Sequence, residues 1–396
     1  MEVVVTGIGL VSALGTSLET NWQQLISAKS GIRVHQPFAE LESRPLALIG
    51  NQPAELTALT QLVVADAMKD AGLVPPLPDG GVVIGSSRSH QASWEQLARQ
   101  FYRDAALPKD ASYTAARTRG GSLPMQAFLD TLPHMSAIAA ARQVAISYGP
   151  VLAPMAACAT GIWAIAQGFE LIQTGQCQRV IAGAVEAPIT PLTLAGFNQM
   201  KALARTGAYP FDQRREGLVL GEGAAVLVLE SSELAKRRSA PVYGQVLGFG
   251  LTADGYHVSA PEPGSRSAIA AVKQCLERSD LSSSDIDYIH AHGTATQLND
   301  RNEAQLIQRL FPQGVPVSST KGATGHTLGA SGALGVAFCL MALKHQMLPP
   351  CVGLKEPEFE LDLVSVPRRG EIRSVLCFSF GFGGQNAVMA LGRQTG

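Results

Sequence analysis

The chain is 396 residues long, 46% of them apolar and 16% charged, with 40 glycines and a net charge of −1. This length exceeds what one hydrophobic core usually serves, and the apolar content excludes a disordered chain. A net charge near zero gives no global attraction to nucleic acid or to an anionic membrane. We therefore expect a compact α/β protein with two core units that binds neither.

The six cysteines lie scattered along the chain, without a CxxC pair: Cys158, Cys177, Cys275, Cys339, Cys351 and Cys377. A disulfide framework or a metal site would cluster them, so we expect free thiols in a reducing compartment and no metal. Glu2 stands where a signal peptide would carry positive charge, and the apolar stretch 328–343 suits a buried helix better than a membrane span. These features predict a soluble, cytoplasmic protein.

Short β-branched runs alternate with helical stretches, which is typical of α/β layering. In chain order, the first series of expected elements is a strand at 2–7, helices at 18–29 and 59–71, strands at 82–85 and 151–156, a helix at 159–173, and strands at 180–185 and 224–229. Residues 87–136 are polar, rich in arginine and irregular, and we interpret them as an insertion.

The order then repeats. The second series is a strand at 242–250, a helix at 267–277, a strand at 286–291, a helix at 301–310, a strand at 315–318, a helix at 328–343 and a strand at 375–379. The repetition predicts two similar halves, residues 1–236 and 237–396. We expect their two sheets to stack, with helices between and outside them.

Cys158 lies where an apolar strand turns into a helix, within the sequence Ala-Ala-Cys-Ala-Thr-Gly. A helix N-terminus favours a thiolate, so this position predicts a lowered thiol pKa, and backbone N–H groups at the turn could hold an oxyanion. The alternative is an inert buried cysteine, which is common. The other five cysteines lack this setting.

Two histidines also stand at junctions between strand and loop. His292 precedes Gly293 and Thr294, and His326 follows Gly325 at the head of the second long helix. A single histidine is usually structural. Two at such edges, beside glycine and threonine, make a functional role harder to dismiss.

Together these motifs resemble the β-ketoacyl-acyl-carrier-protein synthases of the I/II type, which have the thiolase fold. The resemblance covers nearly the whole chain and rests on the turn at Cys158, on His292-Gly-Thr, on Lys321 with Thr-Gly-His326, and on the closing Ser-Phe-Gly-Phe-Gly-Gly around Phe382. It implies a layered α-β-α-β-α fold. The half containing residues 1–236 would carry the nucleophile, and 237–396 would carry both histidines.

The resemblance also implies a reaction. Cys158 would take an acyl chain from an acyl carrier protein, and a malonyl thioester would lose carbon dioxide and attack that chain. His292 and His326 would hold the enolate, and the backbone N–H groups of Cys158 and Phe382 would form the oxyanion hole. The resemblance further implies support from Lys321 paired with Glu303, contacts from Thr294 and Thr296 to the phosphopantetheine arm, and gating by Phe382. No further cofactor is implied.

Two departures from the family pattern concern substrate and partner. Relatives are glycine-rich after residue 86, where this chain has Ser87-Arg88-Ser89-His90, beside the acyl pocket. The stretch 55–60 lacks the basic residues that often dock the carrier. Candidate replacements are Lys109, Arg117, Arg119, Lys201 and Arg205. A fatty-acid and a polyketide pathway both remain open.

Two other functions compete. A thiolase acting on coenzyme A thioesters would need a second cysteine near the C-terminus, and Cys377 is the candidate. A non-catalytic chain-length partner of another synthase would typically lack the nucleophile, whereas Cys158 is present. A homodimer is expected, with its shared edge at strand 151–156, and a heterodimer with a related subunit stays possible.

Overall fold

The computed structural model describes residues 1–105 and 125–394, and for 101–105 the backbone alone. Its main feature is a mixed sheet of eleven strands in the order β12-β10-β9-β14-β15-β8-β1-β7-β6-β4-β5. The strand bounds are β1 Val3–Ser12, β4 Gly81–Gly85, β5 Val151–Leu152, β6 Arg179–Glu186, β7 Gly223–Ser231, β8 Gly244–Ala253, β9 Tyr288–His290, β10 Pro316–Ser318, β12 Asp362–Leu363, β14 Ser374–Gly381 and β15 Gln385–Gly392.

Two similar halves make up this sheet. In the first half β1 and β6 are antiparallel to β7, while β4 and β5 continue in parallel from β6. The second half repeats this pattern, with β8 and β14 antiparallel to β15, and β9 and β10 parallel to β14. The predicted α/β fold built from two similar halves is therefore confirmed.

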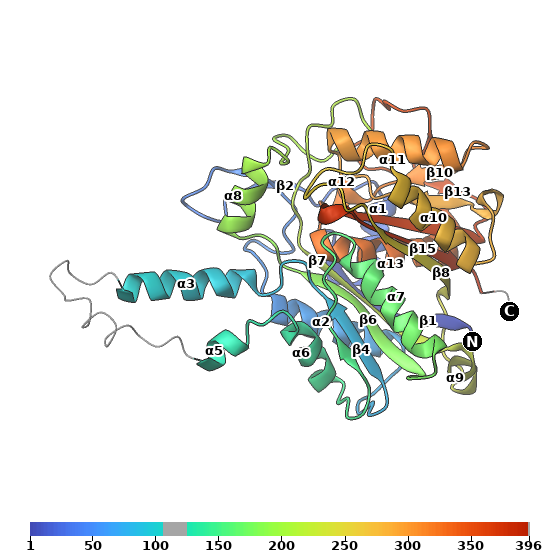
Figure 1. The fold of residues 1–396 in the computed structure, drawn as a ribbon, viewed down its shortest axis with the longest axis horizontal. Coiled ribbons are helices and arrows are strands. Elements are labelled where there is room, and N and C mark those ends of the chain that lie inside the picture. Colours follow the sequence, from blue (N-terminus) through green and yellow to red (C-terminus); the bar gives the residue numbers. More distant parts are fainter. Residues whose placement is uncertain (106–124, 395–396) are drawn as a thin grey trace.

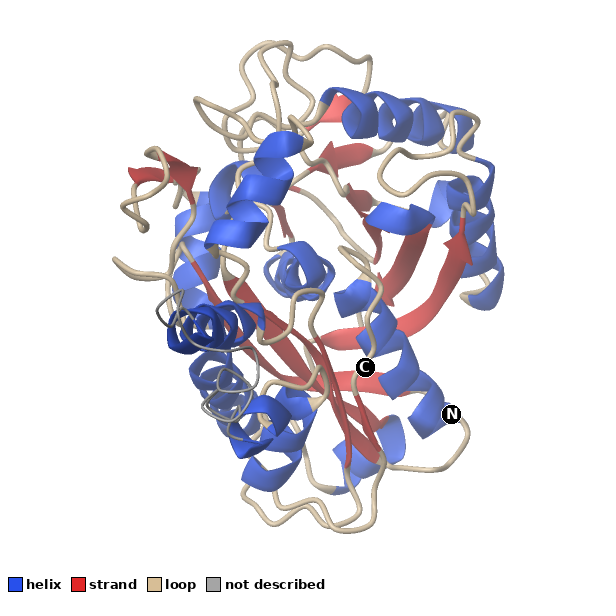
Figure 2. Ribbon diagram, turned by 60° about the vertical axis from the view of Figure 1, so that its left-hand side comes forward, coloured by secondary structure: helices blue, strands red, loops and turns tan. Residues whose placement is uncertain are grey.

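The sequence led us to expect two separate sheets, but the strands of both halves belong to one sheet. Val3, Val4 and Val5 of β1 pair antiparallel with Val246, Gln245 and Gly244 of β8. Within the sheet, the two halves are therefore joined through this pair of strands. Away from these strands the half-sheets diverge to enclose helices, as Figure 2 shows.

Helices complete the layers. Those between the half-sheets are α7 (Thr160–Gln173) and α13 (Ser331–His345), which contact strands of both. The outer helices are α2 (Leu56–Asp70) and α6 (Met135–Gln143) on the first half-sheet, and α10 (Arg266–Arg278) on the second, with α11 (Gln297–Leu310) beside it. This is the predicted α-β-α-β-α order, with a separate apolar cluster in each of the three spaces between layers.

The central helices touch backbone to backbone. A Cβ at Gly161 of α7 would lie 2.4 Å from the backbone nitrogen of Ala333 in α13, so this contact requires glycine. Leu328–His345 is the one stretch of the described residues that is long and apolar enough to cross a membrane, and 89% of it is buried in the fold. The prediction of a buried helix there is confirmed.

Part of the segment 87–136 is helical, so the expectation of an irregular insertion was wrong for it. Its helices are α3 (Gln91–Ala105) and α5 (Met125–Leu129), which project away from the sheet in Figure 1. Trp94 of α3 donates a hydrogen bond to the carbonyl of Thr131 and packs edge-on against Phe128. Polar composition concealed an amphipathic helix whose apolar side chains pack against its own partner helix.

The remaining elements are short, apart from the nine-residue helices α1 and α8: α1 (Leu18–Ile26), α8 (Pro191–Gln199), α9 (Ser232–Arg237), α12 (Lys321–Thr324), β2 (Arg33–His35), β3 (Arg44–Leu46), β11 (Met347–Leu348) and β13 (Arg368–Arg369). Strand β5 is also shorter than the expected 151–156. Pro154 has no N–H to donate to a ladder, and the chain leaves the sheet there to form the turn at Cys158.

Candidate active site

Cys158 sits in a tight turn immediately before α7. Ala157 adopts a left-handed conformation, with φ of +47°, which reverses the chain. Thr160 stabilises this turn, since its hydroxyl donates to the carbonyl of Ala157 and accepts from the N–H of Ala156. The residues around Cys158 are small because the turn leaves no room for larger side chains.

A second loop, at the end of β14, approaches this turn. Ser379 donates a hydrogen bond to the carbonyl of Cys158 over 2.8 Å, and the backbone N–H of Phe382 interacts with the Cys158 sulfur. Gly383 and Gly384 follow with φ of +78° and +74°, values that favour glycine. Two backbone segments, one from each half of the chain, therefore meet at one sulfur atom.

Gly381 makes that approach possible. A Cβ there would lie 2.9 Å from the carbonyl oxygen of Ala156 and 3.0 Å from the nitrogen of Cys158. Gly381→Ala should displace the loop and move the Phe382 N–H from the sulfur. If Cys158 is acylated as the resemblance implies, this should slow its acylation about 10²-fold, a typical cost of losing one oxyanion donor. Intact-protein mass spectrometry measures this rate. Gly370→Ala, where a Cβ meets nothing within 4 Å, is the control, and equal rates in both variants would contradict the prediction.

The pKa of Cys158 departs from the expectation of a lowered value. Burial raises it to about 11, against the opposing influence of the Lys321 charge. The side chain is only 7% exposed, so the loss of hydration outweighs the favourable position before the helix. The resting group is therefore a protonated thiol, which would have to lose its proton to act as a nucleophile.

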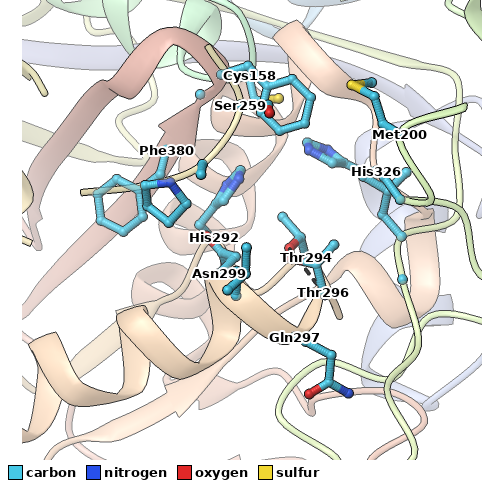
Figure 3. Close-up of a pocket in the computed structure, with 18 of the residues that line it drawn as sticks. Cys158, Met200, Ser259, His292, Thr294, Thr296, Gln297, Asn299, His326 and Phe380 are labelled. Atoms are coloured by element: carbon cyan, nitrogen blue, oxygen red, sulfur yellow. Dashed lines mark hydrogen bonds between the residues drawn. The ribbon is translucent and has the colours of Figure 1, made fainter. Parts of the chain in front are cut away.

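His292 and His326 face each other beside this sulfur. Their ring centroids are 5.4 Å apart with planes at 80°, and in Figure 3 both rings point into the space next to Cys158. Burial lowers the pKa of each histidine well below its ordinary value, assisted by the Lys321 charge. Both imidazoles are consequently neutral at physiological pH, and each carries one N–H.

Lys321 determines which nitrogen of His292 carries that proton. Its ammonium donates to the carbonyl of His292 and lies 3.4 Å from the ring Nδ1. Because an ammonium can only donate, Nδ1 is the acceptor and the proton resides on Nε2, on the opposite side of the ring. The Nδ1 of His326 is buried and has no hydrogen-bond partner among the described residues.

The side chain of Glu303, in α11, binds the backbone of the same histidine. The carboxylate accepts hydrogen bonds from the N–H groups of His292 and Gly293, at 2.6 and 2.7 Å, and burial raises its pKa to about 7. No ion pair joins Glu303 to Lys321 within the described ranges. The two residues bind opposite polar groups of the His292 backbone instead of each other.

Cys158 and the two histidines line a cavity of about 310 Å³, which we call the Cys158 cavity. Six of the predicted residues share it: Cys158, His292, Thr294, Thr296, His326 and Phe382. The hydroxyls of Thr294 and Thr296 lie 2.9 Å apart, below the two histidines in Figure 3. Lys321 and Glu303 are absent from the lining and act through His292.

Sequence reasoning missed several residues around this cavity. Phe197 of α8 stacks on Phe382 with centroids 5.9 Å apart, and Phe380 lies 5.9 Å from the ring of His292. Helix α8 itself carried a signal that could have been used, since Thr190 caps it and Pro191 occupies its first turn. Nothing in the sequence indicated that its aromatic ring meets Phe382.

Cys377 does not occupy the position that a second catalytic cysteine would need. It is fully buried in β14, its sulfur lies 3.8 Å from Nδ1 of His290, and it does not line the Cys158 cavity. This placement counts against the thiolase alternative.

Comparison with known proteins agrees with this geometry. The N-terminal domain model of the β-ketoacyl synthase family matches residues 52–235, and the C-terminal domain model matches residues 243–355. A 3-oxoacyl-[acyl-carrier-protein] synthase 2 from Rhizobium meliloti is 35% identical, over 100% of this chain and 99% of its own length.

Two solved structures are also similar. A ketosynthase determined with its type II polyketide acyl-carrier protein and a bound hexaketide has a TM-score of 0.90 and 25% identity, with 99% of both chains covered. The ishigamide ketosynthase/chain length factor has a TM-score of 0.88 and 26% identity, over 100% of this chain and 99% of that one. The predicted resemblance is thus confirmed. The chain belongs to the β-ketoacyl synthase family of acyltransferases, the ketosynthases of fatty-acid and polyketide chain elongation.

Proposed function

We propose that Cys158 is the nucleophile that carries the acyl chain. The thiol would attack the carbonyl of an acyl thioester on an acyl carrier protein, pass its proton to the departing carrier thiol, and leave the acyl group bound to sulfur. The N–H groups of Cys158 and Phe382 would hold the oxyanion of this step. The observation that supports the assignment is the position of the Cys158 sulfur in one cavity with two neutral histidines.

The histidines would act in the second half of the reaction. When a malonyl thioester loses carbon dioxide, the electron pair of the broken bond passes to the α-carbon and the thioester oxygen becomes negative. N–H groups of His292 and His326 would donate to that oxygen. The α-carbon then attacks the acyl carbonyl on Cys158, the carbon–sulfur bond breaks, and a β-ketoacyl thioester two carbons longer is released.

The carrier protein would approach from the threonine side. Thr294 and Thr296 offer hydroxyls to the amide groups of a phosphopantetheine arm, so the carrier itself brings the only cofactor. Lys201 and Arg205 are exposed beside this entrance, and Lys201 lines the cavity, so they are suited to contact an acidic carrier. The other three basic candidates, Lys109, Arg117 and Arg119, lie outside the described residues.

The assembly and location are parts of the same proposal. Strand β5 ends the sheet, so its outer edge is open to pair with a second copy, as a homodimer would require. The relatedness to a ketosynthase with a chain length factor supports a heterodimer as the alternative. We place the enzyme in the cytoplasm, in keeping with six cysteines that are all free.

Purified protein with acyl- and malonyl-carrier protein tests the proposal. We expect the mass of the protein to rise by one acyl group, and carbon dioxide and a β-ketoacyl product to appear once malonyl-carrier protein is added. Absence of acylation with every chain length would refute it. If condensation then appeared only with a second synthase added, the chain would be a partner subunit.

A further inference from the structure

Helix α11 places two buried carboxylates against residues 292–296, which carry one histidine and both threonines of the site and which we call the 292–296 loop. Glu303 accepts hydrogen bonds from the first two N–H groups of this loop, at 2.6 and 2.7 Å. Asp300, which has no exposed surface, accepts from the N–H of Ala295 over 3.2 Å and from that of Phe211 over 2.8 Å. One turn of helix therefore binds three of the five N–H groups of the loop.

The 292–296 loop needs this support because its backbone is strained. Gly293 has φ of +37° and Ala295 has φ of +65°, a left-handed conformation that is unfavourable for a residue with a Cβ. Such a backbone persists only where the surrounding contacts fix it. The N–H of Ala295 is itself one of the groups that Asp300 binds, so a change in the carboxylates should release the loop.

Asn299 connects the two carboxylates. Its Nδ2 donates to Oδ1 of Asp300 over 3.1 Å and to Oε2 of Glu303 over 3.2 Å. Ionised carboxylates only accept, so the nitrogen of the amide faces them and both of its N–H groups are used. Asn299 is half-buried, lines the Cys158 cavity and is drawn directly below His292 in Figure 3.

The two carboxylates are close enough to affect each other. Burial raises the pKa of Glu303 to about 7, and the charge of Asp300 raises it as well, while Lys321 opposes both effects. Burial also raises the pKa of Asp300 to about 6, against the amide of Asn299 and the charge of Arg215. The imidazole of the loop is neutral and adds no charge. Donors between two like charges favour the ionised form of each.

We propose that Asn299 is a positioning residue whose amide joins the carboxylates of Asp300 and Glu303 and so fixes the 292–296 loop for the reaction. The inference rests on the proposed role of His292. A protonated carboxyl is a weaker acceptor for the loop N–H groups, so the rate of carbon dioxide release should fall as the pH is lowered and Glu303 takes up a proton. Without the Asn299 donors the ionised form is less stable, so the fall should begin at a higher pH.

The test measures carbon dioxide release from malonyl-carrier protein between pH 6 and pH 8.5. Asn299→Leu removes both donors, and we expect its rate to fall about one pH unit above wild type, the effect of one hydrogen bond to a charged group. Its rate relative to wild type should thus be about tenfold lower at pH 6 than at pH 8.5. Asn299→Asp adds a third carboxylate and regains a donor only when protonated, so its relative rate should instead rise from pH 8.5 to pH 7.

Asn302→Leu is the matched control and should keep the wild-type pH profile. Asn302 is a half-buried asparagine of the same helix, outside the lining of the Cys158 cavity, and its side chain forms no hydrogen bond with the residues that the structure describes. Hydrogen–deuterium exchange of the 292–296 loop, compared at equal pH, follows the loop without the reaction and should be faster in Asn299→Leu than in wild type.

Three outcomes would overturn the inference: a loss of rate in Asn299→Leu that is the same at every pH, unchanged exchange of the 292–296 loop, or an equal shift in Asn302→Leu. If wild type released no carbon dioxide while the loop exchanged faster in Asn299→Leu, the positioning role would be supported. That result would count against the proposed role of the histidines.

Discussion

Replacing Cys158 with alanine is expected to abolish acylation and to lower condensation by about 10⁴-fold or more, as is typical when an enzyme loses its nucleophile. The release of carbon dioxide from malonyl-carrier protein should persist, because the two histidines that we propose to bind the malonyl thioester remain in place. The variant should fold normally, since the substitution leaves a methyl side chain in a turn that already consists of small residues. Intact mass and carbon dioxide release measure the two halves of the reaction separately.

Cys177→Ala provides the control for this experiment, because Cys177 is also buried and free but lies outside the Cys158 cavity. It should acylate and condense at the wild-type rate. If Cys158→Ala still became acylated, the nucleophile would have to be another residue.

Replacing His292 or His326 with leucine should slow carbon dioxide release about 10²- to 10³-fold each, because each would remove one of the two N–H donors that we propose for the enolate oxygen. Glutamine also carries an N–H donor, so His292→Gln should lose less than His292→Leu. Since burial keeps the pKa of both histidines well below its ordinary value, they stay neutral between pH 8 and pH 6. The rate of carbon dioxide release should therefore not change through titration of His292 over this range. Wild type and His292→Gln should have pH profiles of the same shape.

His345→Gln is the matched control, because His345 lies at the end of α13 and stacks on Trp22, away from the cavity. It should release carbon dioxide at the wild-type rate. Equal losses in the leucine and glutamine variants of His292 would show that the ring acts by its shape and not by donating a hydrogen bond.

The layered fold could be predicted because its signals are local. Local composition predicts β1 and β8 as strands and α13 as a buried helix. The order of such elements along the chain revealed the repeat. The pairing of β1 with β8 could not be predicted, since no local pattern tells which strand of one half meets which strand of the other. The helix α3 was missed because it contributes no buried residue to the core among positions 91–100, and its Trp94 contacts Phe128 of α5 instead.

At the site, the sequence suggested Cys158, His292 and His326 by their positions where strands end, and the structure places all three around one cavity. What sequence could not provide was their environment. The pKa of Cys158 is set by burial, which depends on segments from both halves, and the prediction from the helix end alone had the wrong sign. Lys321 and Glu303 were expected to pair with each other, whereas in the structure both contact the backbone of His292.

The close contact between α7 and α13 has a consequence for how accurately the site is built. Cys158 stands just before the first of these helices and His326 just before the 3₁₀ turn that leads into the second, so both are anchored to the same rigid pair. With Gly161 bringing backbone against backbone, no flexible side chain lies between the helices at that point to transmit or absorb movement. The spacing of nucleophile and imidazole is consequently a dimension of the scaffold, and surface loops can lengthen, shorten or change sequence during evolution without altering it.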